Sequence, residues 1–290
     1  MFFREEFIKT GLVLEGGGLR GIYTAGVLDV FLEHGITFEG VIGVSQGAIL
    51  ASSYLSGQKG RGIRYCKKYC GDKRMMSVGS LLATGDFINV KFSYDTLPNE
   101  LDLYDYDAFF KNPTEYYVVC TDVETGKPEY IRITDLRTQM DYLRASASLP
   151  FMSRIVEIDG KKYLDGGVSD SIPVEQFRKM GFDRIVVVQT RPENYRKKPS
   201  KMSRMGWMYH KYPKFLATMD RRSEDYNYTM ERIADLKRSG EIFAIAPSKV
   251  LGVGRLEKDP EKIQAQYDLG REDALKILGN LKAYLDGTGA

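Results

Sequence analysis

The chain has 290 residues, of which 43% are hydrophobic and 28% are charged, and its formal net charge is +3. This length can bury a full core, as one large domain or as one domain with a small appendage. Three cysteines, an odd number, argue against a disulfide framework and favour a reducing compartment. Since there is no signal peptide and no apolar run long enough to span a bilayer, we expect a cytoplasmic protein, with peripheral membrane contact left open.

Apolar runs and helical spacing alternate along the chain in the way that builds a sheet covered on both faces. The pattern predicts strands at 11–15, 40–44, 116–121, 184–189 and 242–246. It predicts helices at 20–34, 47–56, 135–145, 173–180, 223–238 and 260–284, the last with Asp259 as N-cap and Pro260 in the first turn. The expected fold is therefore α/β, with three α/β/α layers and a mostly parallel central sheet.

A glycine-rich loop, Gly16-Gly17-Gly18-Leu19-Arg20-Gly21, joins the first predicted strand to the first predicted helix. Consecutive glycines let backbone N–H groups converge on an anion, either a phosphate or a tetrahedral oxyanion. The string also fits the dinucleotide-binding pattern, which requires an acidic residue at the end of the next strand. Glu39 comes before that strand and Ser45 follows it. This order favours the oxyanion over the nucleotide.

The second motif is Gly43-Val44-Ser45-Gln46-Gly47, between the apolar pair Val41-Ile42 and a small-residue helix. A serine at such a strand-to-helix turn is a nucleophile elbow, which indicates acyl transfer. The pentapeptide alone is common by chance. Its strand-and-helix context and the neighbouring motifs give it weight.

The base that would activate Ser45 is the next question, because the chain has only two histidines. His34 falls in the last turn of a predicted helix before Gly35, where a structural role is expected. His210 has no carboxylate beside it in the sequence. Asp165 is a better candidate: it ends the second strand of a hairpin predicted to turn at Asp159-Gly160. The alternative is that Asp165 is an ordinary turn residue.

Together, the glycine loop, the serine elbow and Asp165-Gly166-Gly167 resemble the three signatures of patatin-like phospholipases, in that family's order. Ala145-Ser146-Ala147-Ser148-Leu149-Pro150-Phe151 resembles the family's stretch before the aspartate. The resemblance covers about residues 10–190 and implies a lipid acyl hydrolase with a Ser-Asp dyad and no metal or organic cofactor. It implies Ser45 as nucleophile, Asp165 as base and Gly16, Gly17 and Gly18 as the oxyanion hole. The supporting motif positions are Arg20, Gly21, Gly43, Gly47, Gly166 and Gly167.

The expected domain organisation is a patatin-like catalytic domain at 10–190, a basic aromatic connecting segment at 191–222 and a C-terminal α/β extension at 223–290, packed on the core. The connecting segment holds ten Lys and Arg against Glu193 and Asp220, with interleaved Met, Trp and Tyr. Cations beside such side chains suit an anionic lipid surface, so we expect a lid or a membrane-facing element and no nucleic-acid partner. A lipid ester is the expected substrate. A dinucleotide-dependent oxidoreductase and a non-catalytic lipid-binding protein are the alternatives.

Overall fold

A computed structural model describes residues 8–199 and 202–288. Its centre is an eight-stranded sheet in the order β5-β6-β3-β2-β1-β7-β8, with β4 paired to β3. The strands are β1 (Thr10–Leu14), β2 (Gly40–Val44), β3 (Glu115–Asp122), β4 (Pro128–Ile133), β5 (Val156–Ile158), β6 (Lys161–Asp165), β7 (Arg184–Val188) and β8 (Ile242–Ile245).

The sheet is mixed, and its parallel part carries the predicted strands. β3, β2, β1, β7 and β8 run parallel, whereas β4, β5 and β6 join by antiparallel pairing. Residues 11–14 of β1 and all of β2 are buried, as expected for parallel strands covered on both faces. The predicted strands are present within two residues of their expected ends.

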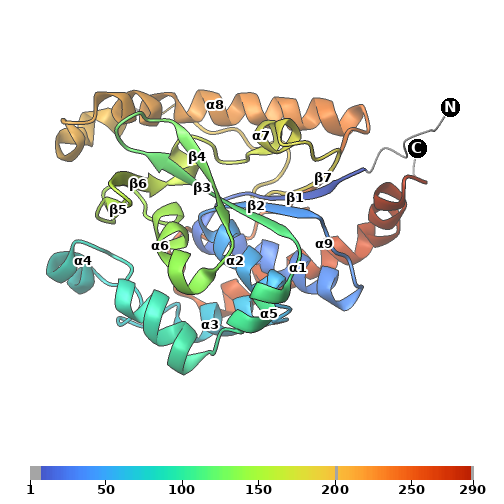
Figure 1. Ribbon diagram of the computed structural model, residues 1–290, viewed down its shortest axis with the longest axis horizontal. Helices are drawn as coiled ribbons and strands as arrows, with labels where there is room; N and C mark the ends of the chain where they lie inside the picture. Colours follow the sequence, from blue (N-terminus) through green and yellow to red (C-terminus); the bar gives the residue numbers. More distant parts are fainter. Residues whose placement is uncertain (1–7, 200–201, 289–290) are drawn as a thin grey trace.

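Helices cover both faces of this sheet (Figure 1). Alternation along β1 shows the two layers: Leu12 and Leu14 belong to one core cluster, Val13 to the other. The first cluster packs against α1 (Ile22–Glu33), α2 (Gln46–Leu55), α3 (Arg61–Tyr69), α5 (Tyr106–Lys111), α6 (Leu136–Ser146) and α9 (Pro260–Asp286). The second packs against α7 (Val174–Lys179) and α8 (Pro213–Arg238). The α/β/α prediction is therefore confirmed.

Two helix predictions can be compared closely with the structure. In α9, the Asp259 side chain accepts a hydrogen bond from the Glu261 amide at 2.9 Å, so the predicted N-cap is confirmed. The helix predicted at 223–238 is wrong at its start. It begins ten residues earlier, at Pro213, which occupies the first turn. The boundary expected between residues 222 and 223 therefore falls inside α8.

The region between α2 and β3 contains elements that the sequence pattern did not predict. Besides α3 and α5 it holds α4 (Val78–Thr84) and a π-helix at Phe92–Leu101 that includes Pro98. α4 and α5 have only seven and six residues, too few for helical periodicity to become visible, and Pro98 argues against a helix at 92–101. β4 was also missed. The hairpin of β5 and β6 was predicted, and its turn residues Asp159 and Gly160 have φ of 52° and 77°, the left-handed conformation that a tight hairpin requires.

Candidate active site

Ser45 is the single residue between β2, which ends at Val44, and α2, which begins at Gln46. Its φ of 54° and ψ of −123° lie outside the regions that side-chain-bearing residues prefer. The turn is tight enough that a Cβ on Gly47 would lie 2.6 Å from the carbonyl oxygen of Leu14. Gly43 is equally crowded, because its Cβ would lie 2.6 Å from the Cα of Ala48. The elbow therefore depends on glycine on both sides.

Asp165 reaches Ser45 because three strands, β2, β4 and β6, all pair with β3. β4 pairs with residues 116–121 of β3 and so covers one edge. β2 pairs with residues 115–119 and β6 with residues 120–122, so these two strands must follow each other along the opposite edge. Val44 is opposite Val119, and Asp165 is opposite the next residue, Cys120. The ends of β2 and β6 thus meet end to end.

Direct contact joins the two side chains at this junction. The Ser45 hydroxyl donates a hydrogen bond to Oδ2 of Asp165 at 2.8 Å, and the Gly167 amide donates to Oδ1 at 2.7 Å. Burial raises the pKa of Asp165, while the positive charge of Arg222 and the two hydrogen bonds act in the opposite direction. Such an arrangement suits a carboxylate that must accept a proton while excluded from water.

The glycines after Asp165 allow this approach. A Cβ on Gly166 would lie 2.1 Å from the carbonyl oxygen of Val119, in the middle of β3. Gly166 therefore lets the chain leave β6 directly against its neighbour strand. Gly167 supplies the amide that holds Asp165, and its carbonyl accepts a hydrogen bond from Nε of Arg222.

The glycine loop lies beside the serine. Gly16, Gly17 and Gly18 line the same polar cavity as Ser45 and Asp165. Within the part of the chain that the structure describes, the amides of Gly16 and Gly17 have no hydrogen-bond partner. Arg20 reaches the same cavity, and Gly21 packs against the side chain of Gln46 on α2. A Cβ on Gly16 would lie 3.2 Å from Cβ of Ser45, so the loop with its unpaired amides lies against the serine.

Two cavities of different character open at Ser45. The first has an empty volume of about 1020 Å³ including its mouth, the second about 480 Å³. They share Gly18, Ser45, Leu149 and Arg255. The reacting hydroxyl therefore lies where an apolar cavity and a charged one meet.

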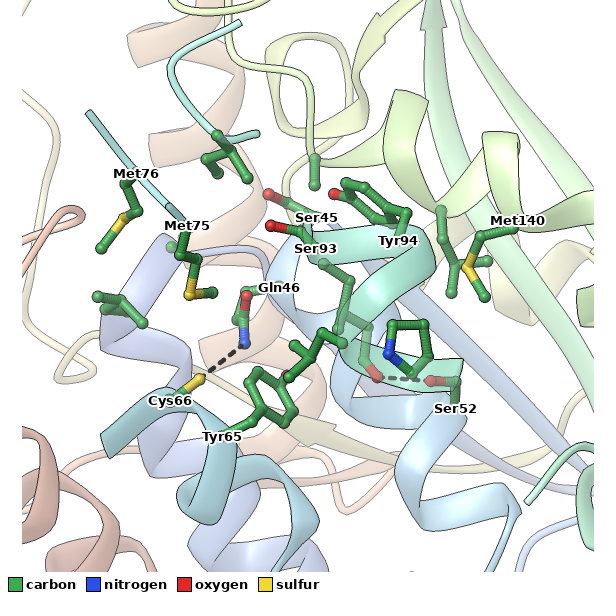
Figure 2. Close-up of a pocket in the computed structure, with 18 of the residues that line it drawn as sticks. Ser45, Gln46, Ser52, Tyr65, Cys66, Met75, Met76, Ser93, Tyr94 and Met140 are labelled. Carbon is green, nitrogen blue, oxygen red and sulfur yellow. Dashed lines mark hydrogen bonds between the residues drawn. The ribbon is translucent and has the colours of Figure 1, made fainter. Parts of the chain in front are cut away.

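The larger, apolar cavity is lined by segments that come before β3 in the sequence and by segments that come after it. Figure 2 shows Ser45 at its upper end beside Ser93 and Tyr94, with Met75 on one side and Met140 on the other. The walls come from α2, from residues 61–104 and from α6 with its following loop. Nearly half of the lining residues belong to the region between α2 and β3 whose helices were not predicted, which is why the sequence did not reveal this cavity.

The smaller cavity carries positive charge, of which the sequence analysis assigned only Arg20 to the site. Its cations are Arg20, Arg191, Lys197, Arg222 and Arg255. Lys197 belongs to the segment that was expected to face a membrane. Lys201, in the same segment, lies outside the described residues. Sequence spacing could not bring these side chains together, because they lie on separate loops and on α8.

Neither histidine lines the two cavities. His34 follows the last residue of α1, where the structural role was expected, and Gly35 has the left-handed φ of 64° that commonly ends a helix. His210 is exposed, with Nδ1 2.8 Å from the carbonyl oxygen of Trp207. Glu39, the residue weighed for a dinucleotide site, accepts a hydrogen bond from the Thr10 amide at the start of the sheet. The structure does not favour the dinucleotide alternative, because Glu39 is at the opposite end of β2 from Ser45.

Two features are absent from residues 8–199 and 202–288. No helix in these ranges is long and apolar enough to cross a membrane. Nor do the described residues contain a group of three or more His, Cys, Asp or Glu side chains placed to hold a metal ion.

Comparison with known proteins gives two family matches. A family model described as patatin-like phospholipase matches residues 12–178, and one described as a domain of unknown function (DUF6363) matches residues 212–286. Uncharacterized protein YjjU of Escherichia coli is 28% identical over 269 residues, covering 91% of this chain and 75% of that protein. Lysophospholipase NTE1 of Cryptococcus neoformans is 29% identical over 200 residues, which cover 64% of this chain but only 12% of that protein. The crystal structure of VipD from Legionella pneumophila aligns with a TM-score of 0.46 at 15% identity, covering 94% of this chain and 67% of that one.

Proposed function

Because this chain belongs to the patatin-like phospholipase family, we propose that it hydrolyses ester bonds of phospholipids or lysophospholipids, with Ser45 as nucleophile and Asp165 as base. The observation that carries this proposal is the 2.8 Å hydrogen bond from Ser45 to the buried Asp165 at the end of an apolar cavity. The family match and the similarity to a lysophospholipase support lipid hydrolase activity. A non-catalytic lipid-binding protein would have no need of this contact.

The proposed reaction has two stages. Asp165 accepts the Ser45 proton as Oγ attacks the ester carbonyl, and the amides of the glycine loop bind the oxyanion. Asp165 gives this proton to the departing alcohol, and Ser45 carries the acyl group. Water then attacks the acyl-enzyme and gives a proton to Asp165, which passes it to Oγ of Ser45 as the fatty acid leaves.

The apolar cavity is the proposed acyl site. Its space of about 1020 Å³, which includes the open mouth, is lined mainly by apolar side chains. Methionine and leucine side chains contribute much of its lining, including Met75, Met140 and Leu143. These flexible side chains can adapt to a long chain. The carbonyl of a bound acyl group would then lie at Ser45.

The direct test of the nucleophile is covalent labelling. We expect a fluorophosphonate to add once to the wild-type protein and to be mapped to Ser45, because the elbow exposes the hydroxyl beside oxyanion donors. Intact-mass analysis and peptide mapping give the result. The Ser56→Ala protein is a control that should label normally, since Ser56 follows the last residue of α2, donates to the Ser53 carbonyl and lines neither cavity. An unlabelled wild type, folded and with excess reagent, contradicts the proposal.

Dependence on pH tests the role of Asp165. The base must be ionised, so kcat/KM for a soluble ester should fall at acidic pH, with a midpoint above the ordinary carboxyl pKa of 3.8 because burial raises the pKa of Asp165. The charge of Arg222 lowers this pKa. Arg222→Gln should therefore move the acidic limb to higher pH. Arg221→Gln changes the exposed neighbouring residue and should leave the acidic limb in place. An unshifted limb in Arg222→Gln would mean that the charge of Arg222 does not act on the pKa of the base.

Contact with a membrane is proposed for the start of α8 and for the end of the 3-10 helix before it, Met202–Tyr209. Trp207 is 80% exposed and Met208 49% exposed, and Lys211 and Lys214 are exposed close by. The hydroxyl of the buried Tyr209 accepts a hydrogen bond from the Phe151 amide, two residues after Leu149, which lines both cavities. This exposed group therefore adjoins the loop at the site.

Removing the two lysine charges tests this contact. Each lysine near an anionic surface contributes about 1 kcal/mol, so Lys211→Gln/Lys214→Gln should bind anionic vesicles about 30-fold more weakly. Vesicle hydrolysis should fall with binding, whereas hydrolysis of a soluble ester should stay near wild type. Tyr228→Ala, which removes another exposed aromatic side chain of α8, is the control. Unchanged vesicle binding in the double variant would exclude this surface.

A further inference from the structure

The polar cavity beside Ser45 has an excess of positive charge. Four arginine side chains and Lys197 line it, together with the carboxylates of Glu15 and Asp165. Both carboxylates already accept hydrogen bonds from neighbouring uncharged groups. Oε1 of Glu15 accepts a hydrogen bond from the Tyr226 hydroxyl at 2.8 Å, and its Oε2 accepts one from the Thr190 amide. Asp165 binds Ser45 and Gly167.

The cations themselves lack acidic partners. Across the described ranges 8–199 and 202–288, no salt bridge includes Arg20, Arg191, Lys197, Arg222 or Arg255. The buried Nε of Arg20 has no hydrogen-bond partner at all among the described residues. Since an unpaired buried polar group is costly, this nitrogen indicates that a ligand completes the cavity.

Aromatic and hydroxyl groups hold several of these cations in place. Nζ of Lys197 lies 3.6 Å from the centre of the Tyr226 ring and 3.4 Å from Oγ of Ser171. The guanidinium of Arg191 lies 4.4 Å from the centre of the Tyr195 ring. These contacts hold the two side chains in place without bringing a negative charge to them. The cavity is therefore arranged before any ligand binds.

Burial and neighbouring positive charge both lower pKa values in this cavity. Burial, followed by repulsion from Arg222, lowers the pKa of Lys197 to about 6. Burial likewise lowers the pKa of Arg20 to about 10, with Arg191 and Arg255 acting in the same direction. A bound anion would relieve this repulsion.

We propose that the polar cavity binds a phosphate group on the alcohol part of the substrate, which makes this chain selective for anionic phosphorylated lipid esters over neutral acylglycerols. The assignment rests on the proposed hydrolase function, because it places the two halves of one ester in the two cavities. The acyl chain occupies the apolar cavity and the phosphorylated alcohol the polar one. Ser45, Gly18 and Arg255 lie between them, lining both.

Lipid binding to the inactive Ser45→Ala protein tests this assignment. Calorimetry should compare a lysophosphatidate with the monoacylglycerol of the same acyl chain, both below their critical micelle concentrations. Charge-assisted hydrogen bonds predict about tenfold to hundredfold tighter binding of the phosphorylated lipid. Adding Lys197→Met or Arg191→Gln should reduce this ratio about tenfold. Lys198→Met removes an equal charge from the exposed neighbouring residue and should leave the ratio unchanged.

A second measurement distinguishes binding from a structural effect of the lysine. Sulfate does not titrate near neutral pH, and its charge should raise the pKa of Lys197 from about 6. Sulfate binding at pH 7 should therefore take up protons, seen as a heat that depends on the ionisation enthalpy of the buffer. Lys197→Met should abolish the uptake, and Lys198→Met should retain it.

Three results overturn the assignment or separate it from the proposed function. Equal affinity of Ser45→Ala for the two lipids overturns it. Sulfate binding with proton uptake but without lipid discrimination means that the cavity holds a free anion, which also overturns the headgroup assignment. Discrimination by Ser45→Ala, combined with no hydrolysis of either lipid by the wild type, supports the cavity assignment and contradicts the hydrolase proposal instead.

Discussion

Asp165→Asn is expected to lower kcat/KM for ester hydrolysis by about 10⁴-fold or more, close to the loss in Ser45→Ala. The amide cannot accept the proton that Oγ of Ser45 must lose, although it preserves the size of the side chain. Because the two residues act as a unit, the double variant should lose little more than either single variant. Steady-state kinetics on a soluble chromogenic ester measure all three.

Matched variants make this result specific. Asp170→Asn changes a nearby aspartate that binds the Tyr130 hydroxyl at 2.9 Å and lines neither cavity at Ser45, so it should keep most activity. His34→Gln and His210→Gln should do the same. If His210→Gln proved as damaging as Asp165→Asn, the proposed dyad would have to be replaced by a triad.

Gly166→Ala should be the most damaging small substitution near the site. Its new methyl group would lie 2.1 Å from the Val119 carbonyl oxygen, a contact with backbone that no rotamer change relieves. We expect the free energy of unfolding to fall by about 3 kcal/mol, measured by urea denaturation. Activity should be lost as well, because the strand that carries Asp165 must move away from β3.

A glycine-to-alanine substitution at an open helical position should instead raise the free energy of unfolding. Gly279 is in the interior of α9, and a Cβ on it would have nothing within 4 Å. Gly279→Ala should raise the free energy of unfolding by about 1 kcal/mol, because alanine favours the helix. A Gly166→Ala protein as stable as the wild type would mean that β6 can separate from β3 at little cost.

The parallel strands and the elbow could be predicted from the sequence because their signals are local. A buried run such as Val41-Ile42 and the glycines around Ser45 carry their own backbone requirements. The contact between Ser45 and Asp165 was inferred from resemblance and from the scarcity of histidine. Its geometric cause, the shared edge of β3, depends on the pairing of β4, a strand that was not predicted.

The charged cavity could not be predicted for a different reason. Lys197 was interpreted as part of a solvent-facing basic segment, because charge alone does not show which way a side chain points. Arg222 and Arg255 are 57 and 90 residues beyond Asp165 in the chain, so no spacing rule connects them with it. Only the packing of α8 and of the loop before α9 brings them beside Ser45.

Because β2 and β6 must meet end to end on β3, the return of hydrolysis during refolding reports when β6 has paired correctly with β3. Ser45 and Asp165 are 120 residues apart in sequence, and contacts of such separation form late because they close large loops. A slip of β6 by one residue would turn the Asp165 side chain to the opposite face of the sheet. Recovery of hydrolysis during refolding should therefore lag behind the recovery of helical circular dichroism. The length of this lag measures how late β6 reaches its native register on β3.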